Sequence, residues 1–304
     1  MLIGKISAAL GLPVSYVDKL ANSASHAYKE YKIPKSSGGA RTIYHPSRPL
    51  KGAQRILVQQ FISSWPLHPS AMAYRKGVSI LDNARLHETS NFLLRMDFSS
   101  FFESIQDVDF RRYTEKSPTL FLGWDSADID LLCKLCFRFG RLTIGAPTSP
   151  ALANVLCYEL DSNLANFCAS LGVVYSRYAD DLFFSTKAPN LLSQVEAHVT
   201  RTVSDLEIPS GLSLNVRKTR HSSKKGARRV TGVVLGSDGK LHIGRALKRR
   251  IRAMIHKFSA LTDAERATLS GLMSYAVGFD PDFKNSLIAK YGLATVRQAS
   301  GGGS

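Results

Sequence analysis

The sequence predicts an α+β fold, in which an antiparallel sheet is backed by helices and the C-terminal third is helical. Runs of β-branched and aromatic residues alternate with helix-like stretches up to about residue 245. From Ala246 onward the chain shows basic amphipathic helical spacing, and further helical stretches follow. Strands followed by a block of helices are typical of an α+β core with an added helical lobe.

The first hundred residues are expected to supply helices, a hairpin and one strand. Residues 50–65 have helical spacing, and "IPKSSGGARTIYHP" places a Ser-Gly-Gly loop between two strand-like edges, which indicates a hairpin. "NFLLRMDFSSFFESI" predicts a strand that ends at Asp97, followed by a turn and a helix. Residues 1 to about 32 also show helical spacing, with one apolar stripe formed by Leu10, Val14, Val17, Leu20 and Ala24.

The middle of the chain predicts a long helix followed by a hairpin. Residues 149–172 have helical spacing, with Ser149 as the expected N-cap. "VVYSRYADDLFFST", residues 173–186, then predicts a strand, a turn at Asp180 and Asp181, and a second strand. Strands and turns alternate up to the C-terminal helices, with "SDGK" as a hairpin turn.

Charge is the most informative bulk property. The 304 residues include 40 Lys and Arg against 24 Asp and Glu, which gives a net charge of +16. Such an excess favours a polyanionic partner, most often nucleic acid, and a merely soluble basic protein is the alternative. No apolar run approaches the roughly 18 residues of a membrane-spanning helix, so no membrane partner is expected.

Two further features point to a cytoplasmic protein without cysteine chemistry. The N-terminal residues lack the pattern of a signal peptide, and four cysteines in this length are compatible with a reducing compartment. Cys133 and Cys136 match a CxxC spacing, but their apolar flanks predict a buried helix and no second ligand pair follows.

Three aspartates lie at the ends of strand-like runs. Asp97 ends one run, and Asp180 and Asp181 lie between two others. If these strands are neighbours in one sheet, the three carboxylates meet at one edge, where their burial requires a cation. Hard divalent cations such as Mg²⁺ prefer oxygen ligands, and two of them can activate a hydroxyl and stabilise a leaving pyrophosphate. Arg177 is the alternative counter-charge.

Six segments in order resemble the motifs of reverse transcriptases. "YADD" at residues 178–181 resembles the YxDD motif, and "RMDFSSFFESI" resembles the first carboxylate motif of the palm. The others are "PKSSGGARTIYHP", "GAPTSPALANV", "LNVRKTR" and "VTGVV", and together they cover about residues 28–252. "NARLH", from Asn83 to His87, and "VTG" are similar to signatures of bacterial retron reverse transcriptases.

This resemblance implies a right-hand polymerase fold with fingers, palm and thumb. The palm would be an antiparallel sheet backed by helices, and the thumb would be helical. It implies N-terminal helices and fingers over residues 1–95, a palm with insertion helices over 96–235, and a thumb over 236–298. Residues 299–304, rich in Gly and Ser, read as a linker.

The resemblance also implies a catalytic site. Asp97, Asp180 and Asp181 would be catalytic and would hold two Mg²⁺ ions, for which Mn²⁺ could substitute. The backbone carbonyl of Phe98 would join them as a metal ligand. Phe102, five residues after Asp97, matches the steric gate that excludes a ribose 2′-hydroxyl, and a core phenylalanine is the alternative.

Other residues would bind the nucleotide. The family usually has Pro-Gln before the glycine of "GAPTSP", whereas this chain has Thr143 and Ile144, so a polar side chain near the nucleotide sugar is missing. For Lys35 the alternative is an ordinary solvated charge. The residues assigned to nucleotide binding with Phe102 are Lys35, Arg41, Gly145, Pro147 and Lys218.

A third set would contact RNA or the primer–template. Clustered Lys and Arg side chains neutralise phosphates and make binding depend on salt, while a merely solvated basic face is the alternative. The residues assigned to this set are Asn83, His87, Lys224, Lys225, Arg228, Arg229, Val230, Thr231, Gly232, Arg245, Lys248, Arg249 and Arg252.

The expected activity is RNA-directed DNA polymerisation in an anti-phage retron. The enzyme would extend from a cognate non-coding RNA of the msr–msd type with dNTPs, and would make a branched RNA–DNA product similar to msDNA. A retron effector protein would be a further partner. The alternatives are a group II intron-like, diversity-generating or abortive-infection reverse transcriptase, and a non-catalytic RNA-binding scaffold.

Overall fold

The computed structural model divides the chain into two compact units, each built from separate stretches of sequence. It describes residues 2–34, 38–278 and 280–301. The first unit comprises residues 1–76, 94–184 and 190–220, and the second comprises residues 77–93, 185–189 and 221–304. The expected division into fingers, palm and thumb stays a prediction. Every helix in the described ranges is too short or too polar to span a bilayer.

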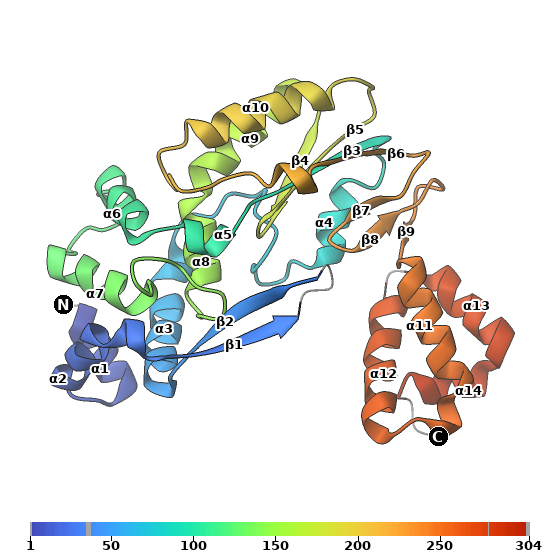
Figure 1. The fold of residues 1–304 in the computed structure, drawn as a ribbon, viewed down its shortest axis with the longest axis horizontal. Helices are drawn as coiled ribbons and strands as arrows, with labels where there is room; N and C mark the ends of the chain where they lie inside the picture. The colour runs from blue at the N-terminus through green and yellow to red at the C-terminus, as the bar shows by residue number, and fades with distance from the viewer. Residues whose placement is uncertain (1, 35–37, 279, 302–304) are drawn as a thin grey trace. The chain divides into compact units, whose positions relative to one another are not determined.

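The first unit begins with packed helices and a hairpin. Helical spacing over residues 1–32 is only partly right, because Gly11 has a left-handed φ of +64° and Pro13 follows it, so the helix breaks. Val14 is therefore exposed, and a strand already begins at Tyr28. The elements are α1 (Leu2–Leu10), α2 (Val14–Asn22), α3 (Arg48–Gln60), α7 (Ser126–Cys136), β1 (Tyr28–Pro34) and β2 (Ala40–Pro46), the last two pairing in antiparallel fashion (Figure 1).

The central sheet has four strands in the order β4-β5-β3-β6. Its strands are β3 (Phe92–Asp97), β4 (Val174–Tyr178), β5 (Asp181–Thr186) and β6 (Arg220–Ser223). The predicted strand that ends at Asp97 and the predicted hairpin at residues 173–186 are both confirmed. The apolar side chains of β3 and β5, such as Leu94 and Phe183, are fully buried.

Three helices of the first unit follow or flank these strands. The helix expected over residues 149–172 is two helices, because the chain turns at Cys157, and the N-cap position falls on Thr148. Ser149 instead accepts a hydrogen bond from the Thr143 amide at 3.2 Å. The helices are α8 (Ser149–Leu156), α9 (Tyr158–Ser170) and α10 (Leu192–Ser204), and shorter ones are α5 (Phe101–Ser104) and α6 (Asp107–Lys116). Single 3₁₀ turns lie at Ala24–His26, Ile62–Ser64 and Val216–Lys218. Cys133 and Cys136 are buried in α7 as predicted.

The second unit combines a small sheet with a helical bundle. The predicted "SDGK" turn joins the last two strands of the antiparallel sheet β7-β8-β9, and α4 packs against β7 and β8. The four last helices enclose a separate apolar core that includes Ile251, Met273 and Phe283 (Figure 1). The elements are α4 (Ile80–Leu86), β7 (Arg228–Val230), β8 (Val233–Leu235), β9 (Leu241–His242), α11 (Arg245–His256), a 3₁₀ turn (Phe258–Ala260), α12 (Asp263–Val277), α13 (Pro281–Tyr291) and α14 (Leu293–Ala299). Ala299 is buried, so the bundle includes the first residue of the expected linker.

Candidate active site

Three aspartates lie where neighbouring strands end. Asp97 is the last residue of β3 and Asp181 is the first of β5, which pairs with β3 in the sheet. Asp180 occupies the turn between β4 and β5, after Ala179 with a left-handed φ of +57°. The carbonyl of Asp180 accepts a hydrogen bond from the Phe98 amide at 3.0 Å. The expectation that these strands are neighbours is therefore confirmed.

Asp97 is held by a lysine of the 3₁₀ turn that precedes β6. Its side chain is 3% exposed, and its Oδ1 lies 2.7 Å from Nζ of Lys218. The main chain fixes the same contact, because the Asn215 amide donates to the Asp97 carbonyl at 2.7 Å. Lys218 was assigned to the nucleotide from sequence, and its side chain, 55% exposed, also reaches the open side of the site.

Asp181 is held by an arginine that the sequence analysis missed. Nη2 and Nε of Arg95 donate to Oδ1 of Asp181 at 2.8 and 3.1 Å. Burial still raises the pKa of Asp181 to about 6, because Arg95 only partly offsets burial and the charges of Asp180 and Asp97. Arg95 stands two residues before Asp97, so strand alternation places both on one face of β3. The spacing of two residues could therefore have identified Arg95 as a cation on the same face as the carboxylates.

Arg177, the alternative counter-charge, forms its ion pair with Asp161. Its guanidinium and the Asp161 carboxylate are both fully buried, with Nη2–Oδ2 and Nε–Oδ1 distances of 2.6 and 2.8 Å. Asp161 also accepts a hydrogen bond from the Tyr175 hydroxyl at 2.7 Å. Arg177 therefore joins β4 to α9 and does not neutralise Asp180.

The three carboxylates are chemically suited to divalent metal. Within the described ranges, no three His, Cys, Asp or Glu side chains converge as a ready metal cluster, and two of these aspartates are held by cations instead. Burial raises the pKa of Asp180, and the negative charge of Asp97 adds to the rise. Carboxylate oxygens match the preferences of Mg²⁺, and the raised pKa of Asp180 shows that nearby cations do not fully offset its burial.

A cavity of about 520 Å³ opens beside these carboxylates within the first unit. Its lining includes the charged side chains of Arg41, Asp180 and Lys218 and the apolar side chains of Phe102 and Ile144. Four of the residues assigned to the nucleotide or the metal from sequence are thus brought together with Phe98 in one cavity.

The remaining residues assigned to the nucleotide lie differently. Gly145 has a φ of +114°, and a Cβ there would lie 2.7 Å from the Tyr44 carbonyl, so the close approach that requires glycine is to β2. The Tyr44 amide also donates to the Ile144 carbonyl at 2.8 Å. Pro147 is half-buried and does not line the cavity, and Lys35 lies outside the described residues.

Three polar residues assigned to RNA from sequence are buried in the second unit. Asn83 and His87 are fully buried, and Nδ1 of His87 lies 2.7 Å from the Ser185 hydroxyl. Burial lowers the pKa of His87 to about 3, so its imidazole is neutral. Arg228 is also fully buried and donates to the carbonyls of Ser90 and Gly236. A direct RNA contact by these side chains would require them to leave the interior.

"VTG" forms the tight turn between β7 and β8. Val230 is buried, whereas Thr231 and Gly232 both have left-handed φ values, +48° and +87°. Two successive positive φ values are typical of the turn that joins two twisted strands. The Thr231 hydroxyl donates to the Ile80 carbonyl at 3.1 Å, which ties the turn to α4.

Some of the exposed cations of the second unit line a second cavity. It has a volume of about 720 Å³ and is lined by Lys224, Lys225, Arg229 and Arg245. Lys248 lines it too, but its Nζ lies 2.7 Å from Oδ2 of the buried Asp280. Of the other two assigned cations, Arg249 is exposed and Arg252 packs over the Phe283 ring.

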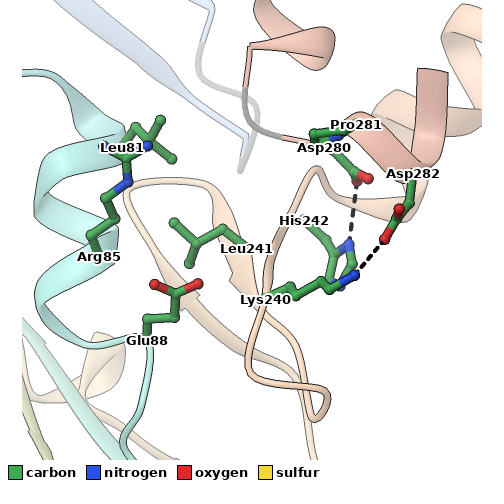
Figure 2. Close-up of a pocket in the computed structure, with 9 residues that line it drawn as sticks. All are labelled: Leu81, Arg85, Glu88, Lys240, Leu241, His242, Asp280, Pro281 and Asp282. Atoms are coloured by element: carbon green, nitrogen blue, oxygen red, sulfur yellow. Dashed lines mark hydrogen bonds and ion pairs between the residues drawn. The ribbon is translucent and has the colours of Figure 1, made fainter. Parts of the chain in front are cut away.

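Asp280 joins several segments of the bundle. Its side chain caps α13 by accepting from the Phe283 amide at 3.0 Å, and it accepts from the Ile243 amide at 3.2 Å. Figure 2 shows Asp280 facing His242, and Lys240 facing Asp282, in a small pocket of about 220 Å³. The charged groups at this pocket largely pair with one another, so their role is to hold the bundle against β9.

The family and the relatives that match this chain are all reverse transcriptases. Residues 33–235 match the family described as reverse transcriptase (RNA-dependent DNA polymerase). The chain is 34% identical over 285 residues to the retron Ec83 reverse transcriptase of Escherichia coli, covering 90% of this chain and 89% of that protein. It is 32% identical over 306 residues to the retron Ec86 reverse transcriptase of Escherichia coli, covering 97% and 92%. For the retron Mx65 reverse transcriptase of Myxococcus xanthus, the values are 32% over 301 residues, 91% and 68%.

Solved structures share the fold at low sequence identity. A telomerase from Candida albicans in complex with a fragment of telomeric RNA matches with a TM-score of 0.52 and 12% identity, over 94% of this chain and 62% of that chain. A foamy viral protease–reverse transcriptase in complex with double-stranded DNA matches with a TM-score of 0.50 and 16% identity, over 91% and 44%. This chain thus spans less than two thirds of either, and the likeness concerns the fold alone.

Proposed function

The chain belongs to the reverse transcriptase family, among the retron reverse transcriptases, and on this premise we propose that it extends a cognate structured non-coding RNA of the msr–msd type with dNTPs. Membership makes it an RNA-directed DNA polymerase with the right-hand fold. The observation that carries the proposal is the cavity beside Asp97, in which Arg41, Phe102 and Lys218 meet Asp180.

The proposed roles follow from the chemistry of each side chain. Asp97, Asp180 and Asp181, with the carbonyl of Phe98, would hold two Mg²⁺ ions, and Mn²⁺ would substitute. Divalent cations of this kind activate an attacking hydroxyl and neutralise charge on the leaving pyrophosphate. Lys218 and Arg95 compensate two of these carboxylates in the structure described above.

Arg41 would bind the triphosphate of the nucleotide, and Phe102 would contact its sugar. The planar guanidinium of Arg41 can donate two parallel hydrogen bonds to phosphate oxygens. The Phe102 ring would exclude a 2′-hydroxyl from the sugar end, which selects dNTPs over rNTPs. Catalysis would then rest on positioning and electrostatics, without a covalent intermediate.

The biological setting is also proposed. Similarity to retron enzymes supports synthesis that starts at an RNA 2′-hydroxyl and yields a branched RNA–DNA molecule of the msDNA kind. By the same similarity, the enzyme would act in the cytoplasm in an anti-phage retron with an effector protein. The basic cavity of the second unit, lined by Lys224, Lys225, Arg229 and Arg245, supports RNA as the partner.

The test is a metal-dependent extension assay on the full chain. Asp180→Ala/Asp181→Ala should abolish dNTP incorporation on an RNA template with Mg²⁺. RNA binding by gel shift should not weaken, because neither carboxylate can attract a phosphate. Asp205→Ala, at an exposed aspartate, is the matched control and should keep full activity. Full activity of the double variant would refute the catalytic assignment.

The RNA that co-purifies with the protein separates the remaining alternatives. A retron enzyme should carry one structured RNA. Its DNA product should be joined to that RNA through a 2′,5′ branch and should be released only by a debranching treatment. An unbranched product would indicate another class of reverse transcriptase. A wild-type protein that binds RNA but incorporates no dNTP with Mg²⁺ would indicate a non-catalytic scaffold.

A further inference from the structure

Tyr74 lines the nucleotide cavity in a strained conformation. It is 55% exposed and has a φ of +61°, in the left-handed region that bulky side chains avoid. A conformation of this kind persists only where the surrounding structure imposes it, and such residues cluster at functional sites. Burial of the exposed Tyr74 side chain is too small to offset this strain. The strained conformation therefore indicates that the residue has a function in the cavity.

The surroundings that impose this conformation are buried and rigid. Nδ2 of Asn154, on α8, donates to the Ala73 carbonyl at 2.8 Å. On the other side, the Arg177 amide donates to the Ser70 carbonyl at 2.7 Å, and the Met72 amide donates to the Arg177 carbonyl at 2.8 Å. Nη1 of Arg177 also donates to Oδ1 of Asn154 at 3.1 Å. The residues before Tyr74 are therefore fixed from two directions.

This fixed backbone places the Tyr74 ring against Phe102. The two ring centroids are 6.4 Å apart at an interplanar angle of 52°, and both residues line the cavity. Phe102 also makes an edge contact with Phe101 at 5.4 Å, and Phe101 stacks on Phe98 at 5.7 Å. The Phe102 ring therefore contacts both the buried aromatic pair and Tyr74.

The apolar residues that line the cavity, such as Phe102 and Ile144, have no group that could form a hydrogen bond with a sugar hydroxyl, so their contribution to selection is one of shape. A half-exposed Phe102 ring excludes an extra hydroxyl only while it cannot rotate away. The rings of Phe101 and Tyr74 both contact it, and either contact restricts such a rotation.

We propose that Tyr74 is a specificity-determining residue, whose ring packs against Phe102 and keeps the cavity too narrow for a ribose 2′-hydroxyl. The inference rests on the proposed polymerase function. Because the effect passes through ring packing, the phenol hydroxyl is not required. The substrate class it excludes is the ribonucleoside triphosphates.

The test compares two substitutions of Tyr74 in the full-length protein. Tyr74→Gly removes the ring and fits the left-handed φ, so its melting temperature should equal or exceed that of the wild type. Its preference for dGTP over GTP, as the ratio of kcat/KM in single-nucleotide extension, should fall about tenfold or more. Tyr74→Phe keeps the ring and should keep the preference. Tyr16→Ala, at an exposed tyrosine of α2, is the matched control.

A double variant shows whether Tyr74 acts through Phe102. Phe102→Ala should lower the preference by itself, and adding Tyr74→Gly should lower it little further, since coupled residues are not additive. An unchanged preference in Tyr74→Gly, or an equal loss in Tyr74→Phe, would overturn the inference. If the wild type incorporates dGTP with a clear preference, either result leaves the polymerase function standing. Absence of dGTP incorporation by the wild type would overturn both.

Discussion

The Asp181 side chain is 20% exposed and lies close to two other carboxylates. Burial, followed by the repulsion of Asp180 and Asp97, raises its pKa from 3.8 to about 6 despite the ion pair with Arg95. Between these two pH values the folded protein binds more protons than the unfolded chain does. The free energy of unfolding therefore decreases as pH rises from about 4 to about 6, and it stays lower at neutral pH.

Asp181→Asn should stabilise the metal-free protein at neutral pH. The amide cannot ionise, so the free energy of unfolding in urea with EDTA at pH 7.5 should rise by roughly 3 kcal/mol, the order set by such a pKa shift. The gain should disappear near pH 4, where Asp181 of the wild type is protonated. A gain of equal size at both pH values would contradict this account, and the exposed Asp205→Asn should change stability at neither.

Among single residues, those fixed by local spacing were predictable. Asp97, Asp180 and Phe102 meet in or beside one cavity because strand ends and a short turn follow directly from the pattern of the sequence. Arg95 was predictable by the same alternation. The partner of Arg177 was not, since the pairing with Asp161 depends on how α9 packs on β4.

At the scale of elements, local signals in the sequence predicted the strands more accurately than the ends of the helices. The hairpins and the strand ending at Asp97 carry strong alternation and turn residues. The break at Cys157 has no Gly or Pro to mark it, so one helix was expected where two exist. At Val14 the signal was present in the sequence. Gly11 and Pro13 mark a break before it, so Val14 begins a new helix and does not continue the apolar stripe of the first one.

Arg177 connects three elements, which makes its removal costly. Arg177→Met should leave the Asp161 carboxylate buried without its cation and lower the free energy of unfolding by about 3 to 5 kcal/mol, measured in urea. Arg177→Met/Asp161→Asn should recover part of this loss, because no buried charge remains. Arg201→Met, at an exposed arginine of α10, should change stability by less than about 0.5 kcal/mol. A similar small change in Arg177→Met would refute the anchoring role.

For the whole molecule, the net charge of +16 overstates the surface available to RNA. Arg177 and Arg228 are buried, and Arg95 and Lys248 pair with carboxylates. Sequence composition cannot separate these internal cations from exposed ones, because both kinds contribute equally to the count. Within the second unit, the exposed cations Lys224, Lys225, Arg229 and Arg245 line one cavity, whereas others such as Lys284 lie outside its lining.

Salt dependence of RNA binding should locate the phosphate contacts at this cavity. Each lost contact lowers the slope of log Kd against log salt concentration by about 0.7 to 0.9, since fewer counterions are released. Lys225→Ala/Arg229→Ala/Arg245→Ala should therefore lower the slope by about 2 to 3.

The matched control removes the same charge from scattered exposed positions. Lys5→Ala/Lys19→Ala/Lys284→Ala has the same net charge as the cavity variant, so a response to net charge alone would change both slopes equally. A slope that falls only in the cavity variant assigns the contacts to this cavity. Equal slopes in the two variants would mean that RNA responds to the overall charge of the molecule and that the cavity has no special role.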